Sequence, residues 1–186
     1  MAENPVIKQM IQRQSVGDLV SPAPSPQELD EILQAALNVP DHGRLQPVRF
    51  HIFEGTSRQK FGDGLAESGA EDTPDLAEKV KDKIRDKAFK APVVIALVCA
   101  TKKGRIPRWE QEATTACAGY AMTLAATSMG YGAIWKSSVF PPGKALKALL
   151  NMEEDASLMG WINLGTPKEG ATDKEAADIG DFVTKH

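Results

Sequence analysis

The chain of 186 residues has a formal net charge of −3, with 42% hydrophobic and 25% charged residues. This length is enough to bury a core without disulfides, so we expect one globular domain over residues 1–186. The small net charge excludes the strong field that nucleic acid or an anionic membrane would require, so we expect neither as a partner. The amino terminus lacks the basic start and apolar core of a secretory signal, which predicts a cytoplasmic protein.

Two capped helices are predicted at the start of the chain. Asn4, followed by a proline, is typical of a helix N-terminus, and the apolar spacing predicts a helix that ends near Arg13. Ser25, a proline and Glu28 form a capping box for a second helix, which Pro40 ends.

The middle of the chain predicts two strands with a helical region between them. Residues 48–53 alternate, which indicates a strand with Val48, Phe50 and Ile52 on a single core-facing side. Thr73 stands before a proline and is the predicted cap of a charged helix. The apolar run 91–100 is typical of a central strand that is buried on both faces.

The second half of the chain predicts a long helix that starts after Pro107, followed by a strand, a short helix, another strand and an extended tail. Residues 113–135 carry no charge, but their many small and polar residues favour a buried helix over a membrane span. Cys99 and Cys117 lie in apolar or alanine-rich runs, which predicts two buried, inert thiols. The element order favours a mixture of helices and strands with one sheet of about four strands.

The sequence lacks the motifs of several enzyme classes. No glycine-rich phosphate loop follows a predicted strand, and no zinc-protease, dithiol or serine-hydrolase motif is present. Acid–base or nucleophilic catalysis by side chains is therefore unsupported, and we predict no catalytic side chain.

Three short polar segments remain as candidate binding sites. They are residues 13–15 at the end of the first helix, the proline-bounded turn around His42, and residues 136–138 at the end of a strand. The polar residues 108–112, which open the long helix, are a fourth candidate. An arginine near a hydroxyl can bind a phosphate, and a lysine with two serines can face a polar ligand. Taken alone, each segment is more often an ordinary solvated surface.

In this order, the segments resemble the nitroreductase family of flavoproteins, and in particular a small bacterial subgroup. The resemblance spans nearly the whole chain. It rests on "RQS" at 13–15, "PDHGRLQP" at 40–47, "PRWEQE" at 107–112, "WKSS" at 135–138, "LGTP" at 164–167 and "FV" at 182–183.

The resemblance implies an α+β sandwich with a central antiparallel sheet covered by helices. It also implies a homodimer that exchanges its C-terminal tails and binds FMN at the subunit interface. NADH or NADPH would be the reductant, and a nitroaromatic, a quinone or an unknown small molecule the electron acceptor. The chemistry would then be carried by the flavin, in ping-pong order.

The resemblance also assigns the cofactor-binding residues. Those expected at the phosphate and ribityl chain are Arg13, Gln14 and Ser15. Those expected at the isoalloxazine ring are Lys136, Ser137 and Ser138. His42, and less directly Asn38, would reach the FMN of the other subunit, whereas His51 is expected to be structural.

Three residues depart from the subgroup pattern. Gln14 replaces an arginine, Val48 replaces a tryptophan, and Ser138 replaces a glycine. Two alternatives therefore stay open: a flavin-binding protein without nitroreductase turnover, and a non-catalytic dimeric interaction module that has lost FMN.

Overall fold

The computed structural model describes residues 4–169 and 177–186. Its strands are β1 (Leu19–Val20), β2 (Val48–Glu54), β3 (Val93–Cys99), β4 (Gly132–Lys136) and β5 (Ser157–Pro167). Its helices are α1 (Pro5–Gln12), α2 (Pro26–Leu37), α3 (Ser57–Asp72), α4 (Glu78–Arg85), α5 (Arg108–Ser128) and α6 (Lys144–Leu149), with the 3-10 helices η1 (His42–Arg44), η2 (Asp86–Phe89) and η3 (Ile179–Phe182).

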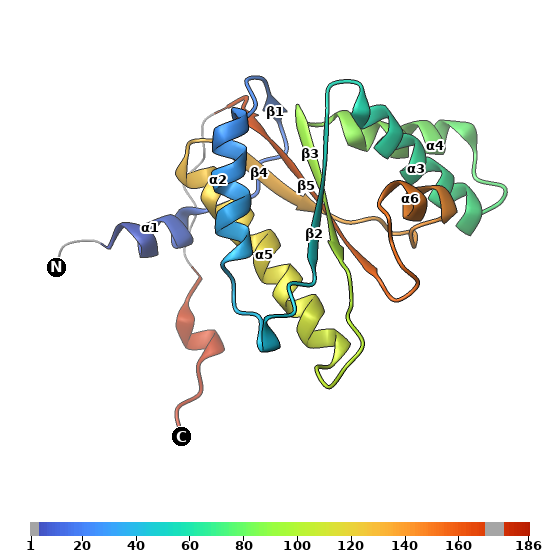
Figure 1. The fold of residues 1–186 in the computed structure, drawn as a ribbon. Helices are drawn as coiled ribbons and strands as arrows, with labels where there is room; N and C mark the ends of the chain where they lie inside the picture. Colours follow the sequence, from blue (N-terminus) through green and yellow to red (C-terminus); the bar gives the residue numbers. More distant parts are fainter. Residues whose placement is uncertain (1–3, 170–176) are drawn as a thin grey trace.

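The five strands form one antiparallel sheet in the order β1-β5-β3-β2, with β4 also paired to β5 (Figure 1). The predicted α+β class with an antiparallel sheet is therefore confirmed. The predicted number of about four strands missed β1, because a strand of two residues has too few positions to show an alternating pattern.

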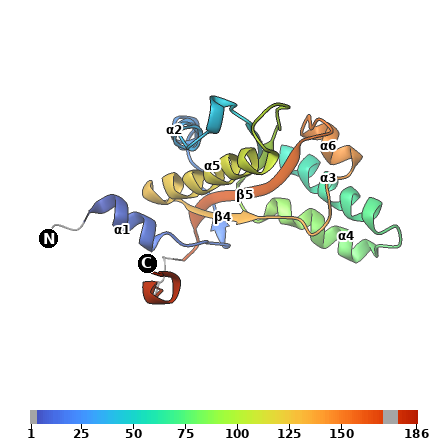
Figure 2. The ribbon, with the colours of Figure 1, turned by 90° about the horizontal axis from the view of Figure 1, so that it is seen from below.

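Hydrophobic cores lie on both faces of the sheet. On one face, β3 side chains pack against α2 and α5, and on the other face they pack against α3, α4 and α6. Figure 2 shows α2 and α5 together on one side of β5. All seven residues of β3 are buried, which confirms the prediction of a central strand covered on both faces.

The two helix caps predicted at the start of the chain are present. Asn4 Oδ1 accepts hydrogen bonds from the second and third residues of α1, and α1 ends one residue before Arg13. The capping box of α2 forms in both directions, with Ser25 Oγ accepting from Glu28 N and Glu28 Oε2 accepting from Ser25 N. These local hydrogen bonds explain why both helix starts could be read from the sequence.

Two predictions in the middle of the chain are wrong. Thr73 caps no helix, since it follows the end of α3, and α4 begins after Ala77 instead. In β2, Val48 and Phe50 pack in one core as predicted, but the prediction is wrong for Ile52, which is 39% exposed, and for Phe53, which is buried. Phe53 is buried on the face opposite to Ile52, because its ring stacks on Phe61 of α3 at a centroid distance of 5.0 Å.

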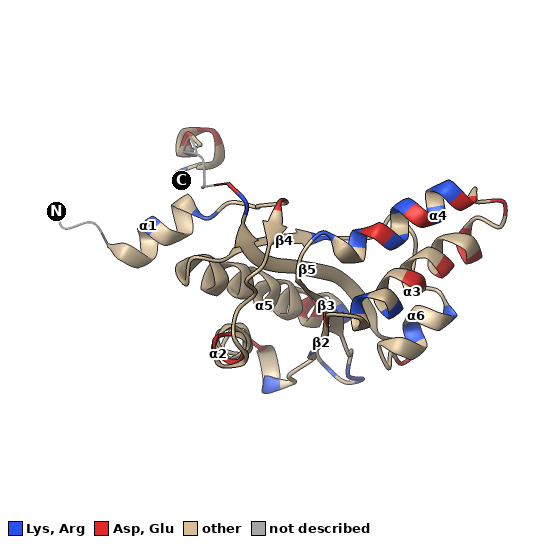
Figure 3. Cartoon of the chain, turned by 90° about the horizontal axis from the view of Figure 1, so that it is seen from above, with Lys and Arg blue, Asp and Glu red and all other residues tan. Residues whose placement is uncertain are grey.

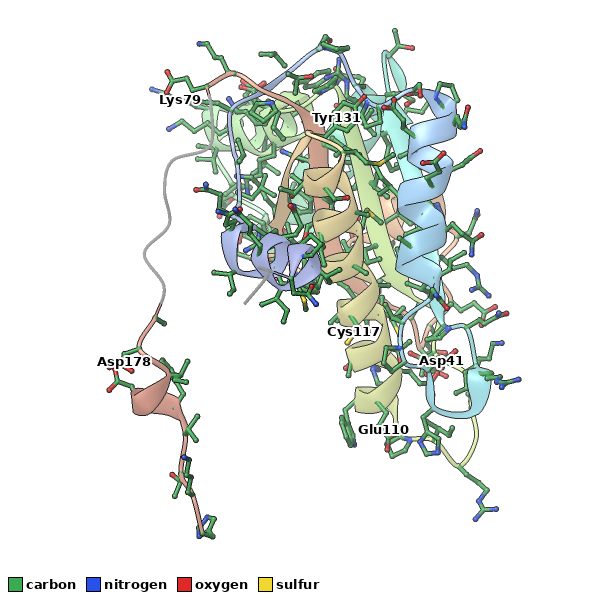
Figure 4. The ribbon with its side chains drawn as sticks, turned by 90° about the vertical axis from the view of Figure 1, so that its left-hand side faces the viewer. Asp41, Lys79, Glu110, Cys117, Tyr131 and Asp178 are labelled. Atoms are coloured by element: carbon green, nitrogen blue, oxygen red, sulfur yellow. The ribbon has the colours of Figure 1, made fainter. Side chains whose placement is uncertain are left out.

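The long helix α5 crosses one face of the sheet. No helix in the described parts of the chain is long and apolar enough to cross a membrane. Cys99 in β3 is buried as predicted, but Cys117 lies on the exposed side of α5, so the prediction of two buried thiols is wrong for Cys117 (Figure 4). An alanine-rich run carries no polar residues to mark its outer side, so the sequence did not show which face is covered.

Both ends of the described chain project from the sheet and its covering helices (Figure 1). No residue of α1 is buried. The tail was expected to be extended, but within the described residues it contains the 3-10 helix η3, which Asp178 caps through Gly180 N at 2.9 Å. The other residues predicted as tail include 170–176, which lie outside the described residues.

Candidate functional site

The turn between α2 and β2 is anchored at both ends by side-chain hydrogen bonds. Thr114 Oγ1 of α5 donates to the Pro40 carbonyl at 3.1 Å, and Gln46 N donates to Asp41 Oδ2 at 2.7 Å. Arg49 Nη1 donates to the Gln46 carbonyl at 2.8 Å. These bonds fix the turn against α5 and β2.

The backbone of this turn lies in the left-handed region at three positions. Gly43, Arg44 and Gln46 have φ values of 74°, 52° and 49°. This conformation costs a non-glycine residue roughly 1 kcal/mol, so the anchoring hydrogen bonds must hold the turn in place. A Cβ at Gly43 would lie 2.5 Å from Ile106 Cδ1.

Replacement of Gly43 by alanine is expected to lower the free energy of unfolding by about 1–2 kcal/mol. The left-handed backbone becomes strained, and the end of the Ile106 side chain must move. Urea denaturation at a fixed protein concentration measures the change. Gly17→Ala is the control, because a Cβ there meets nothing within 4 Å. Equal losses in the two variants would contradict the prediction.

A histidine and a carboxylate meet where this turn touches the start of α5. His42 Nδ1 lies 2.6 Å from Glu110 Oε2. The side chain of His42 is 67% exposed and that of Glu110 is 26% exposed. The imidazole is thus held on one side and open to solvent on the other.

A second polar group links the start of α5 to the start of β5. Ser157 Oγ donates to Glu112 Oε1 at 2.5 Å, and Arg108 donates to both Ser157 Oγ and Glu112 Oε1 at 2.6 and 2.9 Å. The hydrogen bonds from Ser157 and then Arg108 hold the pKa of Glu112 below its usual value. Arg108, Glu112 and Ser157 are all hydrogen-bonded to one another, which indicates a structural role for this cluster.

The segment after α1 runs beside the start of β4, where Val16 N donates to the Ala133 carbonyl at 3.1 Å. Arg13 and Gln14 are partly buried and Ser15 is exposed. Among the described residues, the guanidinium of Arg13 has no hydrogen-bond or ion-pair partner. A partly buried cation in this state is available to an anionic ligand.

The segment 136–138 begins with Lys136, the last residue of β4. Trp135 Nε1 donates to the Met159 carbonyl at 2.8 Å, which ties this end of β4 to β5. Lys136 is partly buried, and its ammonium group also has no partner in the part of the chain that the structure describes. Ser137 is exposed, whereas Ser138 Oγ accepts a hydrogen bond from Phe140 N at 3.1 Å.

In one protomer, the eight predicted site residues fall into two groups. Residues 13–15 and 136–138 flank the two ends of β4. Asn38, which ends α2, and His42 lie near the N-terminal end of α5. Figure 4 shows Asp41 and Glu110 at that end of α5 and Tyr131, which precedes β4, at the other end. The start of β4 thus lies at the opposite end of α5 from His42 and Glu110.

Sequence reasoning missed the contact that Glu110 makes with His42. The two residues are 68 positions apart, so no local spacing relates them. The only signal was that each lies in a separate polar segment, "PDHGRLQP" and "PRWEQE".

Comparisons with known sequences show the family of the chain. The sequence model of the Nitroreductase family matches residues 10–166. The chain is 34% identical over 181 residues to the "Putative NAD(P)H nitroreductase YdjA" of Escherichia coli K12, and the match covers 94% of this chain and 96% of that protein.

Solved structures share the fold at lower identity. A nitroreductase-like family protein from Bacillus cereus superimposes with a TM-score of 0.83 at 19% identity, covering 100% of this chain and 98% of that one. A Desulfovibrio desulfuricans protein, described as a nitroreductase and crystallised with FMN, gives a TM-score of 0.69 at 20% identity, covering 100% and 98% of the two chains. At these identities, the similarity concerns the fold alone.

Proposed function

Because the chain belongs to the nitroreductase family, we propose that it is an FMN-dependent oxidoreductase. It takes reducing equivalents from NADH or NADPH and passes them to a nitroaromatic, a quinone or another small acceptor. The observation that carries this proposal is the pair of partly buried cations, Arg13 and Lys136, that have no partner among the described residues at the two ends of β4. Such a pair suits an anionic ligand that lies along the strand.

The residues around β4 fit FMN in their chemistry. We assign the phosphate to Arg13 and the ribityl chain to Ser15, since a guanidinium donates two parallel hydrogen bonds to a phosphate. Gln14 supplies amide donors but no charge, so Arg13 carries the electrostatic part of that contact. We assign the isoalloxazine ring to Lys136, Ser137 and Ser138. Ser138 keeps its O–H free to donate because its oxygen accepts from Phe140 N.

The proposed function also explains why no catalytic dyad was found. FMN, when bound, supplies the hydride chemistry, and the protein supplies binding, orientation and electrostatics. The Lys136 ammonium and the N–H groups that follow it would supply positive charge to stabilise the anionic reduced ring. Reductant and acceptor would use the same cleft in turn, which gives ping-pong kinetics.

A second copy of the chain would complete the site. Apolar side chains are exposed on α1 and on the described tail, and they include Val6, Ile7, Met10, Ile11, Ile179, Phe182 and Val183. A groove of 540 Å³ with a mainly apolar lining runs between α1 and α5. Figure 3 shows that charged residues gather on α3 and α4, whereas α5 carries few. We infer a homodimer through α1, α5 and the tail, in which His42 and Asn38 reach the FMN bound by the other subunit.

The absorbance spectrum of the purified protein in the flavin region, before and after addition of FMN, tests the cofactor assignment. Anaerobic addition of NADH or NADPH should then bleach the flavin bands. A protein that stays colourless with FMN would overturn the proposed function and favour an interaction module. A bound flavin that neither reductant bleaches would favour a flavin-binding protein without turnover.

Arg13→Ala should weaken FMN binding by about 1.5–3 kcal/mol, because it removes a charged hydrogen bond to the phosphate. This corresponds to a roughly 10- to 150-fold rise in Kd, which can be measured by quenching of flavin fluorescence. Lys60→Ala, which removes a positive charge from an exposed position of α3, is the control and should leave the Kd unchanged. An unaltered affinity in Arg13→Ala would contradict the assigned role.

A further inference from the structure

The contact between His42 and Glu110 specifies more than the position of the ring. Glu110 Oε2 lies 2.6 Å from Nδ1 of His42. A carboxylate only accepts hydrogen bonds, so Nδ1 must carry the proton in this contact. In a neutral imidazole, the other nitrogen, Nε2, then has a free lone pair.

Both residues of the pair are held by their surroundings. His42 belongs to a turn that Thr114 and Asp41 anchor. Glu110 lies in the first turn of α5, where the helix N-terminus favours a negative charge. The carboxylate is largely covered while the imidazole is exposed. The dyad therefore presents the Nε2 side of His42 outward in a fixed orientation.

No described residue bonds to Nε2, so this atom is available to a ligand. We propose that Glu110 is a positioning residue that holds His42 in the Nδ1–H tautomer, so that Nε2 is the atom that contacts FMN in the partner subunit's site. The contact with FMN rests on the proposed function, but the tautomer does not.

Glu112 is the matched control for this proposal. It stands two residues further along α5 and makes a hydrogen bond of similar length, but to Ser157 and Arg108 rather than to His42. Glu112→Gln therefore perturbs the same end of α5 without touching the imidazole. A change in the His42 tautomer or in FMN affinity that both Glu110→Gln and Glu112→Gln produce is structural. A change that only Glu110→Gln produces acts through His42.

The first measurement uses protein without added FMN. The chain has three histidines, so nitrogen-15 NMR at about pH 9, where imidazole is neutral, can resolve the ring of each. We expect His42 to be the Nδ1–H tautomer in the wild type and in Glu112→Gln. Glu110→Gln should give a mixture of tautomers, because an amide can both donate to and accept from Nδ1. A His42 tautomer that is unchanged in Glu110→Gln would overturn the proposal.

The second measurement is a double-mutant cycle with FMN as the probe. Glu110→Gln should raise the Kd of FMN about three- to tenfold, and it should have no further effect in protein that already carries His42→Ala. Losses of FMN affinity that add up in the double variant would show that Glu110 does not act through His42, and they would overturn its positioning role. Wild-type protein that binds no FMN would overturn the proposed function, while the NMR measurement would still decide the tautomer.

Discussion

Gly160→Ala is expected to destabilise the protein by about 3–5 kcal/mol. Gly160 has a φ of 104°, and a Cβ at this position would lie 2.2 Å from the Lys136 carbonyl oxygen and 2.9 Å from Trp135 Nε1. The carbonyl belongs to the backbone of β4, so it cannot move aside as a flexible side chain can. The two strands would have to separate, which would disrupt the hydrogen bond from Trp135 to Met159.

This glycine lies at an irregularity of the sheet. The register between β3 and β5 shifts between Ala96 and Val98, which leaves one extra residue in β5 next to Gly160. Gly160 lies beside the end of β4, where Lys136 pairs with Trp161, and Ser137 and Ser138 follow directly. A folded Gly160→Ala variant should therefore also bind FMN more weakly, if the proposed site is correct.

A comparison with Gly55→Ala separates the two causes of the expected loss. Gly55 also has a positive φ, 53°, but a Cβ there meets nothing within 4 Å. We expect this control to lose about 1 kcal/mol, the cost of the backbone conformation alone. Thermal or urea unfolding at one protein concentration measures both variants. A Gly160→Ala variant as stable as Gly55→Ala would show that the strands can separate at little cost.

Elements with a local signal were predictable from the sequence. The caps at Asn4 and Ser25 depend on side chains within three residues, so their helix starts were correct. The apolar run that forms β3 was also correct, because a strand covered on both faces needs no alternation. In each case the residues that decide the structure are close together in the sequence.

Elements whose neighbours come from distant parts of the chain were not predictable. The helix α3 carries glycines on its buried side, which let α4 and α6 approach but leave no clear apolar stripe. The face of β2 that buries Phe53 is defined by α3, and the exposure of Cys117 depends on what covers α5. Both were wrong for the same reason, since the sequence does not show which partner element lies opposite.

The candidate site shows the same limit. The sequence identified the polar segments 13–15 and 136–138 as candidate binding sites. The structure adds that the side chains of Arg13 and Lys136 have no partner among the described residues. The contact between His42 and Glu110 needed the fold, because it joins the turn after α2 to the start of α5. The assembly of both groups around FMN stays a prediction that depends on the proposed homodimer.

The second large loss of stability is expected where α3 packs on the sheet. Phe61 of α3 is fully buried, stacks on Phe53 of β2 and meets the edge of Trp161 of β5 at a centroid distance of 5.6 Å. Phe61→Ala should lower the free energy of unfolding by about 3–5 kcal/mol, because three elements would border the cavity that it leaves.

Phe89→Ala is the matched control for Phe61→Ala. Phe89 is 42% exposed and has Arg58 over its ring at 5.3 Å, so its loss removes a surface contact without opening a cavity. We expect this variant to lower the free energy of unfolding by about 1 kcal/mol. Both should be compared at the same protein concentration, because a dimer gains stability as its concentration rises. If Phe61→Ala lost no more than Phe89→Ala, α3 would not pack on the sheet as described, and Phe53 would have no partner to bury it.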